Sequence, residues 1–140
     1  MSVIYFHIEE VDFHIDNPET VKHWISTIIT NYDYTLKELN FVFCSDKYLH
    51  KINVDYLDHD FLTDIITFDQ SEIANTLESD IFISVERVRE NAADLNHTFT
   101  DELHRVIIHG VLHLLGFGDS TVEEKQAMRE KEEACLSLRP

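Results

Sequence analysis

Hydrophobic and polar residues follow two different patterns along the chain. Short runs rich in β-branched and aromatic residues, bounded by polar residues, predict strands. These runs lie at residues 3–8, 39–44, 63–68 and 80–84, and a shorter strand is expected at 11–15. After residue 84, apolar residues instead recur at every third or fourth position, which indicates helices.

Two helices are predicted among the strands. The first has Asn17 as its N-cap and Pro18 at the first helical position, and its apolar period ends near Asn31. The second is capped by Ser45 and Asp46. It runs to about residue 56, and its inner face is expected to carry Leu49, Ile52 and Tyr56.

Three further helices follow the last predicted strand. A cap within residues 98–100 is expected to start the central helix, with Glu102 completing a capping box. Thr121 and Glu124 show the same capping-box spacing at the start of the last helix, whose many charges indicate one solvated face. The central helix is expected to be buried through its apolar residues Val106, Ile107, Leu112 and Leu115.

This order of elements predicts an α+β fold. Strands and helices are mixed early and helices dominate late, so we expect one domain, 1–140, with a small mixed β-sheet covered by helices. No apolar run approaches the roughly 20 residues that span a bilayer. The first residues lack the pattern of a signal peptide, so we expect a cytoplasmic protein with no membrane partner.

The central helix also carries the candidate chemistry. His109 and His113 are four residues apart, which places both imidazoles on one helical face. Gly116 can adopt the left-handed conformation that ends a helix, and Asp119 follows three residues later. His109, His113 and Asp119 are therefore predicted to hold one Zn²⁺ and to leave one position for water. His104 lies on another face and is expected to be a surface or packing residue.

This spacing resembles the long zinc motif of the metzincin peptidases, with two differences. The third ligand there is usually His, and here it is Asp119. The residue after the first His is Glu in those peptidases, where it is the general base, and here it is Gly110. The pattern therefore predicts a zincin-like metal-binding helix in a hydrolase of another class. The same ligand types also occur in iron oxygenases, but usually in β-barrels.

Charge restricts the possible partners. The chain has 11 Lys and Arg against 27 Asp and Glu, a formal net charge of −16, which does not suit long-range capture of nucleic acid. An RNA partner would need bound metal, another protein or a local basic patch, for which Arg87, Arg89 and Arg105 are candidates unless they are ordinary solvated residues. Cys44 and Cys135 show no ligand spacing and are expected to be free thiols.

Three blocks of the sequence resemble one family. HGVLHLLGFGD at 109–119 is similar to the signature HGxLHLxGYDH of the YbeY family of bacterial rRNA-maturation endoribonucleases. NVDYLDHDFLTDIITF at 53–68 and DIFIS at 80–84 are similar to its second and third blocks, in the same order and spacing. The resemblance implies an α+β fold and a zinc-dependent, single-strand-specific endoribonuclease. It would act on rRNA in ribosome maturation and quality control, with the ribosome or ribosomal proteins as partners.

The chain departs from the family pattern at four positions. Asp119 replaces the third metal-binding His, and Gly118 replaces the Asp before it. A carboxylate oxygen also binds zinc well, so the first change keeps a plausible ligand. Leu57 stands where the family has Arg, which removes an expected phosphate contact, and Leu62 stands where it has Pro.

The resemblance implies His109, His113 and Asp64 as catalytic residues. Zinc would polarise water or a phosphate oxygen, and attack by water or by the RNA 2′-hydroxyl are both compatible with the sequence. Asp64 and Thr63 could orient a neighbouring group or the ligand imidazoles, and the alternative for Asp64 is a solvated carboxylate at a strand edge. A different functional class stays open: a ribosome-associated binding factor with a structural metal site and little or no nuclease activity, favoured by the net charge and by Leu57.

Overall fold

The computed structural model describes residues 3–58 and 63–140. Within these residues, four strands form one sheet in the order β1-β2-β4-β3. The strands β1 (Ile4–Glu9), β2 (Thr35–Cys44) and β4 (Thr76–Ser84) run parallel, and β3 (Ile65–Asp69) pairs antiparallel with β4 at one edge. The sheet is therefore mixed, as predicted.

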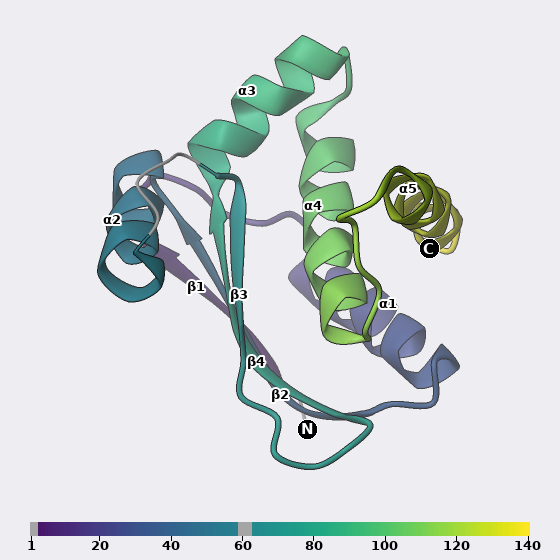
Figure 1. The fold of residues 1–140 in the computed structure, drawn as a ribbon. Coiled ribbons are helices and arrows are strands. Elements are labelled where there is room, and N and C mark those ends of the chain that lie inside the picture. Colours follow the sequence, from purple (N-terminus) through teal and green to yellow (C-terminus); the bar gives the residue numbers. More distant parts are fainter. Residues whose placement is uncertain (1–2, 59–62) are drawn as a thin grey trace.

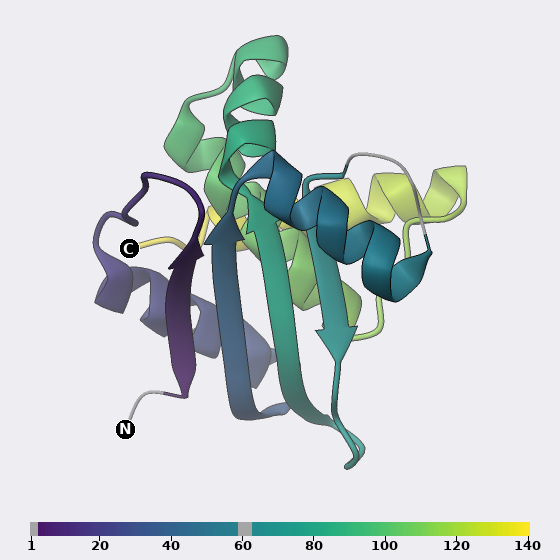
Figure 2. The ribbon, with the colours of Figure 1, turned by 90° about the vertical axis from the view of Figure 1, so that its left-hand side faces the viewer.

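The same residues form five helices, which lie on both sides of the sheet. The helix α2 (Asp46–Leu57) covers one face, and α1 (Pro18–Asn31) and α4 (Phe99–Leu114) lie on the other (Figures 1 and 2). The helix α3 (Val85–Leu95) follows β4, and α5 (Val122–Leu136) lies on the side of α4 that faces away from the sheet (Figure 1). This arrangement confirms the α+β class. No helix of the described residues is long and apolar enough to cross a membrane.

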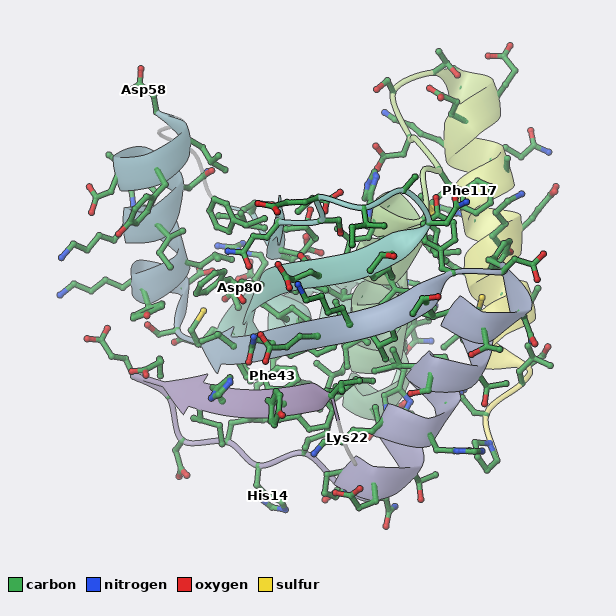
Figure 3. All side chains as sticks on the ribbon, turned by 90° about the horizontal axis from the view of Figure 1, so that it is seen from below. His14, Lys22, Phe43, Asp58, Asp80 and Phe117 are labelled. Atoms are coloured by element: carbon green, nitrogen blue, oxygen red, sulfur yellow. The ribbon has the colours of Figure 1, made fainter. Side chains whose placement is uncertain are left out.

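The central helix α4 packs between the sheet and α5. Its four predicted inner residues, Val106, Ile107, Leu112 and Leu115, are at most 6% exposed, which confirms their burial. They belong to one cluster with Phe41 of β2 and Ile81 of β4. Figure 3 shows side chains from below, with Phe43 of β2 inside the molecule and Asp58 at the end of α2 pointing away from it. Because α4 is held on two sides, the side chains at its C-terminal end are fixed in place.

The strand β1 lies one residue later than predicted, and the strands differ more in three other places. Residues 11–15 form no strand; Val11, Phe13 and Ile15 are partly buried against the core, and this packing explains their apolar alternation. The strands β2 and β4 begin four residues earlier than predicted, because Thr35 and Thr76 extend each other's ladder. The strand β3 begins at Ile65 rather than at residue 63 and ends at Asp69.

The helix ends were predicted with mixed success. Asn17 is the N-cap of α1 and Pro18 starts the helix, as predicted, but Asn17 is in the left-handed region, with φ 51°, and its side chain makes no capping hydrogen bond. Ser45 caps α2 by accepting a hydrogen bond from the Tyr48 backbone N–H, as expected. Tyr56 was expected on the inner face of α2 but is 73% exposed, and the polar Asn53 is buried there.

The cap of α4 also differs from the expected form. Thr98 accepts a hydrogen bond from the backbone N–H of Asp101, so Glu102 is no part of a capping box. Glu102 instead lies inside the protein with no exposed surface, paired with Arg105. The capping box of Thr121 and Glu124 at the start of α5 is present as predicted. The two cysteines are buried free thiols, which agrees with the expectation.

Candidate metal centre

The last turn of α4 brings the three predicted ligands together. His109 and His113 lie one turn apart, with ring centroids separated by 4.5 Å. Gly116 has a φ of 103°, a conformation that L side chains resist, and it reverses the chain as predicted. Phe117 then lies near α5 (Figure 3), where the Lys131 Nζ is 4.8 Å from its ring. This anchored turn carries Asp119 back toward the histidines.

The ligand atoms have separations that suit a tetrahedral ion. Asp119 Oδ2 lies 3.4 Å from His109 Nε2 and 3.5 Å from His113 Nε2. Two ligands at bond lengths of about 2.05 Å and tetrahedral angles are separated by about 3.35 Å. All three ligand atoms lie within 4.8 Å of one another, so His109, His113 and Asp119 can hold a metal ion. Two imidazoles and one carboxylate are a donor set that zinc accepts with one position left open.

A fourth residue of this centre escaped the sequence analysis. The Nδ1 atom of His109 donates a hydrogen bond of 2.6 Å to Glu132 Oε2 of α5. Burial lowers the pKa of His109, but the hydrogen bond and charge of Glu132, together with Asp119 and Asp64, outweigh burial and leave the pKa raised. The available signal was the spacing of Glu132 between Met128 and Cys135, which together form the buried stripe of an otherwise charged helix.

Glu132 belongs to a longer row of charged groups. Arg105 Nη1 donates to Glu132 Oε1 over 3.2 Å, and Arg105 Nε donates to Glu102 Oε1 over 2.9 Å. Glu102 also lies 3.3 Å from His97 Nδ1. The hydrogen bond to Glu102, followed by the charges of Glu102 and Glu132, raises the pKa of Arg105. The row therefore runs from His97 through α4 to His109.

The three arginines proposed as a basic patch do not supply one. Arg105 is paired with two carboxylates, as described above. Arg87 is paired with Asp46 over 2.7 Å and with Glu90 over 3.3 Å. Arg89 lies over the ring of Phe99. Two of the three guanidinium groups are therefore paired with carboxylates within the fold, which is evidence against a free basic patch.

Asp64 lies in the same cavity as the candidate ligands. This cavity of about 580 Å³ is lined by Asp64 and Thr63 on one side and by the two histidines and Asp119 on the other. Asp64 Oδ2 accepts a hydrogen bond of 3.4 Å from Asn91. Burial raises the pKa of Asp64, and the nearby His109 only partly opposes this. Asp64 is thus a shielded carboxyl group facing the site rather than a solvated one at a strand edge.

Gly110 marks a close approach between α4 and the sheet. A Cβ atom placed there would lie 2.7 Å from Ile65 Cδ1 and 3.4 Å from Thr67 Cγ2. A side chain at the position that carries the general base in metzincins would therefore meet β3, and Ile65 would have to move to admit it. Of the other family departures, Leu57 ends α2 and is 37% exposed, and it does not line the cavity. Leu62 lies outside the described residues.

Comparisons with known proteins agree over nearly the whole chain. The family model described as endoribonuclease YbeY matches residues 5–138. A protein named endoribonuclease YbeY from Cytophaga hutchinsonii is 49% identical over 99% of this chain and 96% of its own length. One of the same name from Amoebophilus asiaticus is 47% identical over 92% of this chain and 88% of its own.

A solved structure supports the same fold. The solution structure of TM1509 from Thermotoga maritima has a TM-score of 0.63 and 26% identity, and the match covers 94% of this chain and 87% of that one. With a family model that matches almost every residue and relatives near half identity, the chain belongs to the endoribonuclease YbeY family.

Proposed function

We propose that this protein is a zinc-dependent endoribonuclease that cleaves single-stranded RNA in rRNA maturation and ribosome quality control. The observation that carries the proposal is the convergence of His109, His113 and Asp119 in one cavity of a YbeY-family chain. The relatives' name supplies the substrate class. The proposed acting unit is one domain, 1–140, working in the cytoplasm with the ribosome or ribosomal proteins as partners.

In this proposal the residues of the cavity divide the work. When bound, zinc supplies Lewis-acid activation of water or of a phosphate oxygen. His109 and His113 present their Nε2 atoms to the ion, and Asp119 supplies the third donor. Asp64 stands opposite with a raised pKa, so it holds a proton more readily than an ordinary aspartate and can pass it to or from the phosphate group.

The charge of the cavity makes the ion necessary for substrate binding. The described lining residues include the carboxylates of Asp64, Asp69 and Asp119 and include no Lys or Arg. Such a cavity repels a phosphodiester until a divalent cation offsets its charge. RNA and zinc are therefore expected to bind there together.

A second candidate function is a ribosome-associated binding factor whose metal is structural. The observation that favours it is the pairing of Arg87 and Arg105 with carboxylates, which leaves these guanidinium groups unavailable to RNA in a chain of net charge −16. Such a factor would keep the metal and the fold but would leave single-stranded RNA intact.

Metal content and RNA cleavage together test the proposal. Wild type purified without chelator should hold about one zinc per chain by native mass spectrometry and should cut a labelled single-stranded RNA. His113→Ala removes one of the three ligands, so both the metal and the cleavage should fall at least about tenfold. His23→Ala is the matched control, because His23 is exposed on α1, away from the cavity.

The outcomes separate the two candidates. Equal zinc content in wild type and His113→Ala would reject the metal site. Equal cleavage rates would identify the activity as a contaminant, and the binding-factor function would then take its place. Cyclic 2′,3′-phosphate ends on the products would indicate attack by the RNA 2′-hydroxyl, and 5′-phosphate with 3′-hydroxyl ends would indicate attack by water.

A further inference from the structure

A buried carboxylate in α5 needs an explanation that the proposed reaction does not give. Glu132 is 4% exposed and sits between Met128 and Cys135 on the face of α5 that packs against α4. A charged group removed from water is strongly unfavourable unless specific partners replace its hydration. An apolar residue at this position would pack α5 against α4 without that cost. The role of Glu132 must therefore be sought in the groups that it contacts.

Both oxygens of Glu132 are engaged in a defined way. Oε2 accepts from His109 Nδ1 over 2.6 Å, and Oε1 accepts from Arg105 Nη1 over 3.2 Å. The carboxylate thus bridges a permanent cation and a candidate metal ligand. With Nδ1 engaged, the free nitrogen of the ring is Nε2, and this is the atom that faces Asp119 over 3.4 Å. The bond to Glu132 therefore selects both the tautomer and the orientation of the ring.

We propose that Glu132 is a positioning residue of the metal centre: it holds His109 with Nε2 directed at the ion, although it lies on another helix. This inference rests on the proposed function because it takes the three ligands as a metal site. A histidine that binds a metal through one ring nitrogen commonly donates a hydrogen bond from the other ring nitrogen to a carboxylate, which fixes the orientation of the ring. The turn at Gly116 and the helix α5 then have a shared role, since they return Asp119 and Glu132 to the same histidine.

Arg105 and Glu102 form the support of this arrangement. Arg105 donates to Glu132 Oε1, and Glu102, with no exposed surface, accepts from the guanidinium on the opposite side. Because Arg105 is shared between Glu102 and Glu132, it does not cancel the negative charge of Glu132 completely. Glu132 can therefore still attract the ring N–H of His109. Glu102 and Arg105 act through Glu132 and touch no ligand atom of the proposed ion directly.

A purely structural role would be an ion pair that docks α5 on α4. That role predicts a loss of stability when Glu132 is changed, with no effect on the ring of His109 or on the metal. Glu132→Gln separates the two roles, because it keeps the size and an acceptor oxygen but removes the charge and lets the amide turn. Glu133→Gln is the matched control, since Glu133 is the next residue of α5 and is exposed.

Zinc affinity and the tautomer of His109 are measured in all three proteins. Competition against a chromophoric chelator should show zinc binding roughly 10- to 100-fold weaker in Glu132→Gln than in wild type and unchanged in Glu133→Gln. In metal-free protein, at a pH where the ring is neutral, ¹⁵N NMR should show His109 protonated at Nδ1 in wild type and as a tautomer mixture in Glu132→Gln.

Two results would overturn the proposal. One is wild-type zinc affinity in Glu132→Gln, and the other is an unchanged His109 tautomer in that variant. Thermal melting of the metal-free variants establishes that each is folded. If Glu132→Gln is folded but binds zinc weakly, Glu132→Asp should recover part of the zinc affinity, because it restores a carboxylate. If wild type itself binds no zinc, the proposed function fails, whereas the NMR comparison in metal-free protein still decides whether Glu132 orients His109.

Discussion

Gly110 and Gly116 determine what chemistry the end of α4 can perform. Gly110 faces β3 at a distance that no Cβ atom tolerates without movement of Ile65. Gly116, with its φ of 103°, turns the chain so that Asp119 reaches the histidines. Gly110 provides no side chain that could act as a peptidase base, and the turn at Gly116 allows Asp119 to serve as a third candidate ligand. The candidate metal site is therefore separated from peptidase chemistry by the packing of α4 against side chains of the sheet.

Installing the peptidase base should damage the fold rather than create a peptidase. In Gly110→Glu, the new side chain meets Ile65 and Thr67, so it forces the packed contact between α4 and β3 apart and adds a third acidic group beside Asp64 and Asp119. We expect the free energy of unfolding to fall by about 3 kcal/mol or more, measured by denaturant unfolding. Thr100→Glu adds the same side chain at an exposed position of α4 and should leave stability nearly unchanged. Wild-type stability of Gly110→Glu would show that α4 can move away from β3.

At the scale of whole elements, α5 shows what a sequence pattern conveys and what it omits. Its capping box was predictable because Thr121 and Glu124 are close in the sequence. Its charges indicated one solvated face but not what the other face contacts: Trp24 Nε1 donates to the Cys135 carbonyl over 2.9 Å, and Glu132 accepts from His109 Nδ1 over 2.6 Å. These contacts join residues far apart in the chain, and a periodicity analysis cannot detect them.

The same distinction explains the other successes and errors. The three candidate ligands lie within residues 109–119, where helix geometry and one glycine define the relative positions, so the local pattern was sufficient to predict that they come together. The early starts of β2 and β4 depend on each strand supplying the other's partners, as Thr35 and Thr76 do. Residues 11–15 alternate like a strand but have no strand beside them, since β1 pairs only with β2 in the described sheet. Tertiary pairing determined these outcomes.

The packing of α4 against α1 and the C-terminal end gives the fold a pH dependence. The ring of His104 is tilted against that of Trp24, with ring centroids 5.5 Å apart, and His104 accepts a hydrogen bond of 2.9 Å from Arg139 Nη1. Burial lowers the pKa of His104, the charge of Arg139 lowers it further, and Asp101 opposes this only in part. His104 is thus a packing residue that is neutral in the folded protein, and protonation disrupts its contact with Arg139.

Stability should therefore fall as pH falls below the ordinary histidine pKa of 6.5. The unfolded chain binds the proton near that pH, whereas folded His104 binds it only at lower pH. The stability that neutral His104 contributes is therefore present above pH 6.5 and is lost as the pH falls below it. His104→Gln should show a shallower decline in unfolding free energy between about pH 7.5 and about pH 5. His23→Gln, at an exposed position, should decline like wild type. If the unfolding free energies of wild type and His104→Gln declined in parallel with pH, His104 would not be the group responsible. Other groups such as His109 are present in both proteins and cannot cause a difference between them.

At the scale of the whole molecule, a net charge of −16 has to be reconciled with an RNA substrate. Among the described residues, the arginines next to the site are bound to carboxylates, and the cavity that contains the candidate ligands is acidic. Long-range attraction cannot bring RNA to this surface. Affinity must then come from the metal ion, from contacts with unpaired bases, or from a ribosomal partner that neutralises the charge.

This balance predicts an unusual salt dependence of RNA binding. Each phosphate contact made by Lys or Arg contributes about 0.7 to the slope of log affinity against log salt on a single strand. With few free cations, the slope for this protein should be no steeper than about −2 between about 50 mM and 200 mM salt. Removing zinc should lower affinity more than raising salt does, because the ion brings two positive charges into a cavity lined by Asp64, Asp69 and Asp119. Fluorescence anisotropy with a labelled single-stranded RNA, with the zinc-loaded and the zinc-free protein, measures both effects. A slope near −5, unchanged by zinc removal, would instead require a basic RNA-binding surface that is independent of the metal centre.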